Sequence, residues 1–491
     1  MTLDKDQINS KIRSLCTVLM NDGVSNRDYL EQITYLIFLK MAYERTQAPF
    51  NQTSDIPQWY TWDILVAKDG EDLEKQYRNT LETLAKEWGM LWLIFRKSQN
   101  KISNPAMLKR IINEIDKIQR NVLGVDVKWE IYEWLLSKVA EDTKSWAWQY
   151  FTPRSLISAI VQVMNPTIDI TVNDPCCGTG WFLLEAHEHI LHQWWLDTDQ
   201  LKVLKNNLIS WQELVQDTAR LAVMNMYLHG IGSKESPIAV GDSLAKDPGQ
   251  RYDIILTNPP FGKTSSHTFT TTTGEEETED FQINRDDFWT TTPNKQLNFI
   301  QHIHTILSTR GRAAVVLPDN VLFEWWKGEI VRKKLLDQTN LHTILRLPTW
   351  IFYAKGVKAN VLFFDKKPAS EQIQTKKVWI YDMRTNKKFS LKQSPLRVSD
   401  LEEFIACFNS DNINQRTETR SEQNPEWRRR VFDYEDIIKR DKTNLDIFWL
   451  KDNSLIESEN LPEPWIIASQ IMEELENALE QFSLIEKDLN K

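Results

Sequence analysis

Apolar residues recur at helical spacing through the first part of the chain. The first predicted helix, with Ser25 or Asn26 as its N-cap, carries apolar residues at such positions: Leu30, Ile33, Leu36, Ile37, Leu39 and Met41. Similar patterns follow in LEKQYRNTLETLAKEW and NPAMLKRIINEIDKIQR. Residues 1–145 are therefore predicted to form a helical N-terminal domain, whose pattern by itself indicates packing rather than chemistry.

From about residue 149 the pattern changes to short apolar runs separated by helical stretches. The predicted strands are Ile168–Asn173, Asn207–Ser210, Ile238–Val240, Tyr252–Leu256, Ala313–Leu317, Leu341–Arg346 and Val361–Phe364. Such alternation predicts an α/β domain over residues 146–400, with a largely parallel, Rossmann-like sheet. In this fold the ligand crevice lies beyond the carboxyl ends of the strands, so functional motifs should directly follow strands.

Two segments depart from this alternation. Residues 263–293 are polar, Thr-rich and acidic without a sustained period, which predicts a long mobile loop. Residues 401–491 are predicted to form a C-terminal region that ends in a helix. Its apolar positions step as in a coiled-coil heptad: Ile471, Leu475, Ala478, Phe482, Ile485 and Leu489. This helix is predicted to bind a partner, with packing onto its own domain as the alternative.

Composition narrows the class of protein. The chain has 491 residues, too many for one compact core, and its 41% hydrophobic and 26% charged residues are typical of a folded globular protein. It lacks a long apolar span, and MTLDKDQINSK does not resemble a secretory signal, so a cytoplasmic location is predicted. The four cysteines form no CxxC pair, which favours reduced thiols and predicts no metal site. With a net charge of −10, any contact with DNA must be local or shared with another chain.

The segment YDIILTNPPFGK places Asn258, Pro259, Pro260 and Phe261 at the end of a predicted strand. Two consecutive prolines fix the backbone and remove two donors, so the preceding carbonyl groups are rigidly aimed. The Asn258 side-chain oxygen and the Pro259 carbonyl are placed to accept both protons of an exocyclic amine, while Phe261 offers a face for a flipped base. We interpret these residues as catalytic, although NPP also occurs in ordinary strand-end turns.

A second motif follows the strand predicted at Ile168–Asn173. Asp174 leads into a tight turn containing Gly178, Thr179 and Gly180, and a helix follows. A strand, a glycine turn and a helix N-terminus form the usual crevice for an adenosine-bearing cofactor. The dinucleotide pattern GxGxxG is absent, because residue 183 is leucine.

Two further acidic residues follow later strands. Glu213 stands about where nucleotide-binding α/β folds place the carboxylate that binds the ribose hydroxyl groups. Asp242, in AVGDSL, is placed to accept from an adenine amine. Taken singly, each is equally consistent with an exposed surface carboxylate.

These motifs together strongly resemble the modification (M) subunit of type I restriction-modification systems, a DNA adenine-N6 methyltransferase. The matching segments run in family order over nearly the whole chain: DGVSNRDYLEQITYLIFLKM, IYEWLLSKVAEDTKSWAWQYFTPR, DPCCGTGWFLLEA, ELVQDTARLAVMNMYLHGI, YDIILTNPPFGK, GRAAVVLPDNVLF and TNLDIFWLKD. The joint occurrence of QYFTPR, the glycine turn and NPPF makes the resemblance specific.

The resemblance implies S-adenosylmethionine as cofactor and assigns a set of residues to its methionine end: Gln149, Tyr150, Phe151, Thr152, Pro153 and Arg154. It further implies that Asp174 and the glycine turn line the cofactor site, with Glu213 at the ribose and Asn258–Phe261 as the catalytic loop. The implied partners are double-stranded DNA, a specificity (S) subunit that reads the sequence, a second M subunit, and a restriction (R) subunit in the full complex.

Alternative functions remain open at this point. An NPP loop also suits methylation of cytosine N4 or of a protein glutamine, and a chain without a working cofactor site would act as a non-catalytic scaffold. The chain has 20 tryptophans and only 15 glycines, an unusual ratio that raises a question about the activity of this sequence. Nine tryptophans occupy positions where the family pattern leads us to expect glycine: Trp129, Trp134, Trp146, Trp148, Trp181, Trp211, Trp325, Trp326 and Trp350. Our hypothesis is that a codon meaning glycine in the source organism was translated as tryptophan.

Overall fold

The computed structural model describes most of the chain. The described residues are 26–48, 51–117, 152–193, 195–206, 208–232, 236–261, 266–270, 276–280, 282–352, 357–390, 394–418 and 427–450. Ser25 and the heptad of residues 471–489 lie outside them. Within these ranges, none of the helices has the length and apolar character needed to cross a membrane.

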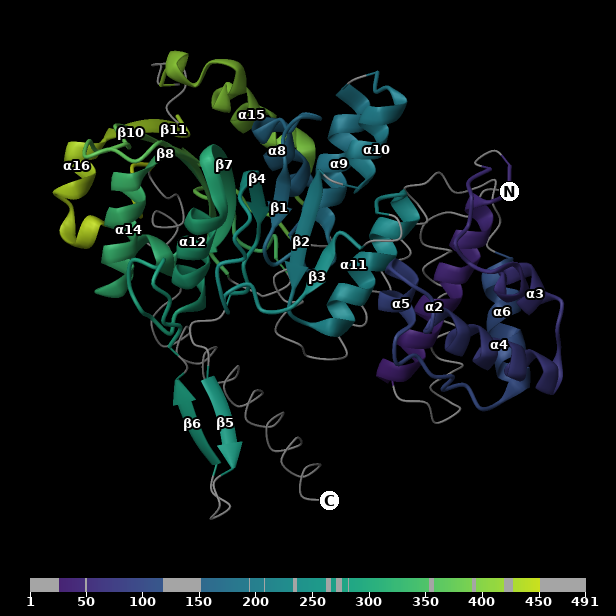
Figure 1. Ribbon diagram of the computed structural model, residues 1–491. Coiled ribbons are helices and arrows are strands. Elements are labelled where there is room, and N and C mark those ends of the chain that lie inside the picture. The colour runs from purple at the N-terminus through teal and green to yellow at the C-terminus, as the bar shows by residue number, and fades with distance from the viewer. Residues whose placement is uncertain are drawn as a thin grey trace, which may run out of the picture.

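Helices make up the described part of the N-terminal region. They are α2 (Asn26–Arg45), η1 (Gln58–Tyr60), α3 (Trp62–Val66), α4 (Gly70–Leu84), α5 (Met90–Phe95) and α6 (Pro105–Asp116). The three predicted helices are confirmed as α2, α4 and α6. Helix α6 begins at Pro105, where the Asn104 side chain accepts hydrogen bonds from the next turn. Figure 1 shows these helices grouped beside α11 (Gln216–His229), which contacts both α2 and α5.

A nine-stranded sheet forms the centre of the rest of the molecule, in the order β11-β10-β8-β9-β7-β4-β1-β2-β3. Its strands are β1 (Val172–Asp174), β2 (Ile209–Glu213), β3 (Ile238–Val240), β4 (Tyr252–Thr257), β7 (Leu307–Pro318), β8 (Thr339–Arg346), β9 (Ala359–Lys366), β10 (Lys377–Asp382) and β11 (Arg429–Asp433). Each predicted strand overlaps one of these, but β10 and β11 were missed. Because β11 lies beyond residue 400, the sheet extends into the predicted C-terminal region; the division into three domains remains a prediction.

The sheet is largely parallel, as predicted. Strands β3, β2, β1, β4 and β7 run parallel, as do β8 and β10, whereas β9 is antiparallel to both of its neighbours and β11 to β10. Strand β1 pairs with β2 on one side and with β4 on the other. The chain thus reverses its direction of sheet growth between β1 and β4. In open α/β sheets the ligand crevice opens at the carboxyl ends of such a pair.

Helices cover both faces of the sheet. Along β7, Ala314 and Val316 belong to one apolar core, and Ala313, Val315 and Leu317 belong to the other. The first core includes residues of α8 (Arg154–Met164), α9 (Trp181–Gln193), α11 and α15 (Glu402–Phe408), and the second includes residues of α12 (Lys295–Ile306), α14 (Lys327–Gln338) and α16 (Tyr434–Ile438). The other helical segments are α10 (Thr198–Asn206), α13 (Asn320–Phe323), η3 (Val398–Leu401), η4 (Ser410–Gln415) and η5 (Asp441–Thr443). The result is a three-layer α/β/α arrangement.

The polar segment 263–293 contains secondary structure that its composition did not predict. Strands β5 (Ser266–Thr270) and β6 (Glu276–Asp280) pair antiparallel, and the hairpin projects away from the main sheet in Figure 1. The prediction of a long loop is therefore wrong for residues 266–270 and 276–280, which form strands. Their threonines favour extended backbone, but the glutamates and aspartate of β6 are uncommon in strands and hid the pattern.

Two of the unusual tryptophans have backbone conformations that favour glycine. Trp326 and Trp350 have φ angles of 57° and 68°, a region costly for a large side chain. Their exposed fractions are 82% and 50%. Trp211 instead lies buried in β2, where its indole N–H finds no hydrogen-bond partner in the described part of the chain. Trp129, Trp134, Trp146 and Trp148 lie outside the described residues.

Candidate active site

The glycine turn and the NPPF segment follow neighbouring strands. Asp174 ends β1, and Asn258–Phe261 directly follow β4. Because β1 and β4 are adjacent and parallel, both segments leave the sheet at the same edge. Both segments follow the carboxyl ends of strands, where the sequence predicted the crevice, and they lie where the direction of sheet growth reverses.

A buried hydrogen-bond cluster ties the two segments together. The Thr257 hydroxyl donates to Asp174 Oδ1 at 2.6 Å, and the backbone N–H of Cys176 donates to the same oxygen at 3.0 Å. Asp174 is only 1% exposed, and this burial raises the pKa of its carboxyl group to about 7. Asp174 therefore links the end of β4 to the turn after β1.

The turn itself depends on its two glycines. Gly178 and Gly180 have φ angles of +56° and +84°, which L side chains rarely adopt. A Cβ atom on Gly180 would lie 2.7 Å from Met226 Cε, whereas one on Gly178 would meet open space. A side chain on Gly180 would thus be strained by the positive φ and would displace the end of the Met226 side chain on α11, whereas Gly178 leaves room for a ligand to approach the backbone closely.

Glu213 lies beside this turn, at the end of β2. Its Oε2 accepts from the Gly178 N–H at 3.0 Å, and its Oε1 accepts from the Val215 N–H at 2.8 Å. Burial raises the pKa of the Glu213 carboxyl group. The exposed side chain of Leu214 follows directly. Glu213 therefore orients the turn and stands at the edge of the space over Gly178.

Asp242 is farther from the centre but on the same edge of the sheet. It is exposed, follows β3, and its Oδ1 accepts from the Leu244 N–H at 2.9 Å. The neighbouring Ser243 hydroxyl donates to the Pro175 carbonyl in the turn after β1. This bond brings the loop that carries Asp242 against the cofactor turn.

Side chains from other parts of the chain contact the catalytic loop. Asn258 Nδ2 donates to the hydroxyl of Thr152 at 2.8 Å, and Thr152 is 7% exposed. The rings of Phe261 and Phe352 pack edge to face, with centroids 5.8 Å apart. The first contact fixes the side-chain amide of Asn258, and the second fixes the ring of Phe261.

The QYFTPR segment is described only from Thr152 onward, so the predictions for Gln149, Tyr150 and Phe151 lie outside the described residues. Pro153 precedes the first residue of α8, and the Arg154 guanidinium lies over the Trp181 ring at 3.8 Å. Trp181 begins α9, directly after Gly180. The structure therefore brings the described end of QYFTPR to both Asn258 and the glycine turn.

Sequence reasoning missed three residues at this site: Thr257, Asn225 and Phe352. Asn225, on α11, is fully buried and its Nδ2 donates to the Thr179 carbonyl at 2.9 Å. The available signal was an asparagine within the apolar run LAVMNMYL, since buried polar groups are usually hydrogen-bonded. Phe352 had no such signal, because its place beside Phe261 depends on pairing between distant strands.

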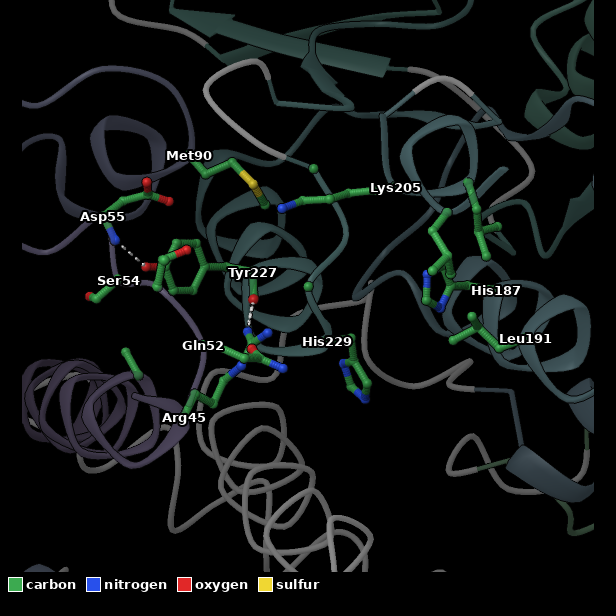
Figure 2. Close-up of a pocket in the computed structure, with 16 residues that line it drawn as sticks. Arg45, Gln52, Ser54, Asp55, Met90, His187, Leu191, Lys205, Tyr227 and His229 are labelled. Carbon is green, nitrogen blue, oxygen red and sulfur yellow. Dashed lines mark hydrogen bonds between the residues drawn. The ribbon is translucent and has the colours of Figure 1, made fainter. Parts of the chain in front are cut away.

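A separate cavity of about 420 Å³ lies between the N-terminal helices and α9–α11, and none of the predicted site residues lines it. Figure 2 shows Arg45, Tyr227, His187 and His229 around it. The Arg45 guanidinium donates to the Tyr227 carbonyl near the C-terminal end of α11, where a positive charge is favourable. This cavity marks the junction between the two parts of the chain rather than the reaction site.

Comparison with known proteins identifies the family. The family model described as N-6 DNA Methylase matches residues 123–450. The chain belongs to the N-6 DNA methylase family. The type I restriction enzyme StySPI methylase subunit of Salmonella potsdam is 36% identical to this chain, over 99% of this chain and 96% of the relative. This extent of similarity places the chain among the type I methylase subunits.

Solved structures agree with the family assignment. The crystal structure of the type I restriction enzyme EcoKI M protein, from Escherichia coli, matches with 32% identity and a TM-score of 0.54, over 99% of this chain and 96% of that one. A modification subunit of a putative type I restriction enzyme from Vibrio vulnificus has a TM-score of 0.70 at 23% identity, over 94% and 99% of the two chains, and supports the fold. The predicted family, fold class and enzyme class of this N-6 DNA methylase are confirmed.

Proposed function

We propose that this N-6 DNA methylase transfers a methyl group from S-adenosylmethionine to N6 of adenine in double-stranded DNA, as the modification subunit of a type I restriction-modification complex. The observation that most directly supports this proposal is the Asp174–Thr257 hydrogen bond, which joins the glycine turn to the NPPF loop. The N-6 family match favours adenine N6 over cytosine N4 and glutamine amides. It gives no support to a scaffold without activity.

The residues of the turn fit a nucleoside-bearing cofactor. When bound, S-adenosylmethionine supplies an electrophilic methyl group. The open space over Gly178 lets a ligand approach the backbone of residues 178–180, and Glu213 stands at the position suited to the ribose hydroxyl groups. Asp242 is assigned to the adenine amine, Asp174 to the lining of the cofactor turn, and residues 149–154 to the methionine end. These assignments rest on position and on the family pattern.

The catalytic loop is proposed to orient and polarise the target amine. The Asn258 side-chain oxygen and the Pro259 carbonyl accept the two amine protons, which favours a tetrahedral nitrogen whose lone pair points at the methyl group. Phe261 stacks on the flipped base. S-adenosylmethionine, held at the glycine turn, would supply the methyl group and leave as the neutral thioether, and the proton lost by the amine would pass to solvent. The protein contributes orientation and aimed acceptors instead of a covalent intermediate.

The proposed partners follow from charge and family. A chain with a net charge of −10 is poorly suited to bind DNA by itself, so we assign sequence reading to a specificity subunit. A second M subunit and a restriction subunit complete the proposed assembly, which acts on DNA in the cytoplasm. The helix predicted at residues 471–489 is the candidate contact with a partner.

The test is methyl transfer by the chain reconstituted with its specificity subunit. DNA incubated with S-adenosylmethionine is digested to nucleosides, and N6-methyladenine is the expected product. N4-methylcytosine, or no methylated base, would overturn the proposal. A titration of the purified chain with S-adenosylmethionine separates an enzyme from a scaffold, because a scaffold shows no saturable binding.

A further inference from the structure

The loop that carries Phe352 is held by a side chain far away in sequence. Arg384 follows β10, and its guanidinium binds both carboxylate oxygens of Asp319, at 2.6 and 2.9 Å. Asp319 directly follows β7, the strand beside β4. A bidentate ion pair between a guanidinium and a carboxylate fixes the relative orientation of the two groups as well as their distance. The pair therefore joins the end of β10 to the end of β7.

The same guanidinium also binds the two strands between β10 and β7. Arg384 Nε donates to the Leu347 carbonyl just after β8, and Nη2 donates to the Ala359 carbonyl at the start of β9, both at 2.8 Å. Leu347 and Ala359 flank the segment that contains Phe352. Asn360 Nδ2 adds a hydrogen bond to Asp319 Oδ1 at 2.7 Å. One side chain thus fixes both ends of this segment relative to β7.

Burial makes this arrangement specific. The side chains of Arg384 and Asp319 are only 11% and 13% exposed. Loss of either charge would leave its partner poorly solvated, so the surrounding loops would have to shift. Phe352 is itself 2% exposed and packs against Phe261 of the catalytic loop. A shift of residues 347–352 would therefore reach the ring proposed to stack on the target base.

We propose that Asp319 and Arg384 are positioning residues for methyl transfer: their ion pair holds Phe352 in place, and Phe352 in turn holds Phe261 in the orientation that receives the flipped adenine. Neither residue touches the glycine turn. Substitutions in this ion pair should therefore impair binding of the flipped adenine and methyl transfer, without changing the affinity for S-adenosylmethionine. This inference rests on the proposed function.

The test uses the chain reconstituted with its specificity subunit and two DNA duplexes. One has adenine at the target position and is used to measure kcat; the other has 2-aminopurine there, which lacks the 6-amino group and reports base flipping alone. Asp319→Asn preserves the size of the side chain but removes its negative charge. Arg384→Lys preserves the positive charge but removes the guanidinium that binds both carboxylate oxygens. Each should lower kcat and the flipping-dependent 2-aminopurine fluorescence by about 10- to 100-fold, as small misplacements in active sites do. The Kd for S-adenosylmethionine should stay within about threefold of wild type.

Two controls distinguish positioning from general loss of stability. Asp433→Asn breaks an exposed ion pair with Lys377 at the opposite end of β10 and should leave kcat unchanged. Phe352→Leu should lower kcat in the same direction as Asp319→Asn. The double variant Asp319→Asn/Phe352→Leu should be no worse than the more impaired single variant, because both act through one ring.

Multiplying effects in the double variant, or wild-type kcat in Asp319→Asn and Arg384→Lys, would overturn this inference while the proposed function stands. So would a parallel loss of S-adenosylmethionine binding and kcat. A wild-type assembly that forms no N6-methyladenine would overturn the proposed function and this inference together.

Discussion

The glycine turn after β1 and the catalytic loop after β4 end neighbouring strands, but different contacts hold them. Buried hydrogen bonds fix the turn: the Gly178 N–H donates to Glu213, and the Thr179 carbonyl accepts from Asn225. The catalytic loop is held by a side-chain hydrogen bond from Asn258 to Thr152 and by an aromatic contact between Phe261 and Phe352. Directional buried bonds tolerate little change, whereas packed rings adapt more readily.

Backbone strain separates the same two regions. In the turn, the positive φ angles belong to Gly178 and Gly180, which adopt them at little cost. Beside the catalytic loop, a positive φ angle belongs to Trp350, two residues before Phe352. The cofactor turn thus has its positive φ angles at glycines, whereas the segment beside the catalytic loop has one at a tryptophan, where glycine fits best.

The largest effect is expected from Asn258→Ala. Removal of an acceptor aimed at the reacting amine should lower the rate of methyl transfer by about 10²–10³-fold, as loss of one oriented hydrogen-bonding group does in other enzymes. Equilibrium dialysis should find S-adenosylmethionine affinity nearly unchanged. Asn340→Ala, at the start of β8, is the matched control and should behave as wild type. Equal loss of transfer and cofactor affinity would contradict the separation of the two regions.

Asp174 should give the apo-protein a distinctive pH dependence. Its folded pKa of about 7 lies above the ordinary value of 3.8, so the folded state holds the proton over this range. The free energy of unfolding should therefore fall as pH rises from about 4 to about 7, by at most about 4 kcal/mol. Urea unfolding of Asp174→Asn should show a smaller slope, and Glu213, whose pKa burial also raises, accounts for the part that remains.

Asp253 is the control for that experiment. Burial alone would raise the pKa of Asp253, but hydrogen bonds from Thr171 and Ser308 outweigh burial and lower this pKa below its ordinary value. Its contribution to stability is thus present above pH 4 and is lost only at lower pH. Asp253→Asn should retain the slope between pH 4 and 7. An unchanged slope in Asp174→Asn would show that burial of this carboxylate does not control the turn.

The two glycines of the turn should respond differently to alanine. Gly180→Ala combines a positive φ with a Cβ atom 2.7 Å from Met226 Cε, and should cost about 1–3 kcal/mol of stability in urea unfolding. Gly178→Ala meets no neighbour within 4 Å and should cost about 1 kcal/mol while weakening S-adenosylmethionine binding. Equal stability losses would remove the distinction between packing and ligand space.

The smallest expected effect is an increase in the free energy of unfolding. Trp350→Gly and Trp326→Gly relieve a positive φ and should each raise the free energy of unfolding by about 1 kcal/mol, because relieved strain exceeds the added flexibility of the unfolded chain. Trp62→Gly should instead destabilise, since Trp62 is buried and its indole donates to Asp116. Mass spectrometry of the protein from its source organism tests the codon hypothesis: tryptophan at these positions would reject it.

Local patterns predicted much of the fold. Apolar residues at helical spacing predicted α2, α4 and α6, and short apolar runs predicted most of the central strands. Both patterns depend only on residues that are close together in the sequence. Strand β10 was missed although KVWIYD is apolar enough, since the preceding polar segment interrupts the β/α alternation. The acidic β6 was missed because its composition opposes strand formation.

The sequence by itself determined which chemical groups the site contains: two prolines that aim carbonyl groups, glycines that adopt positive φ, and acids at strand ends. These depend on covalent geometry and on local order. Only the tertiary structure decided that β4 lies beside β1, that Thr152 meets Asn258, and that Arg384 reaches Asp319. Such contacts join residues separated by 65 or more positions, and they depend on strand order, which local periodicity does not encode.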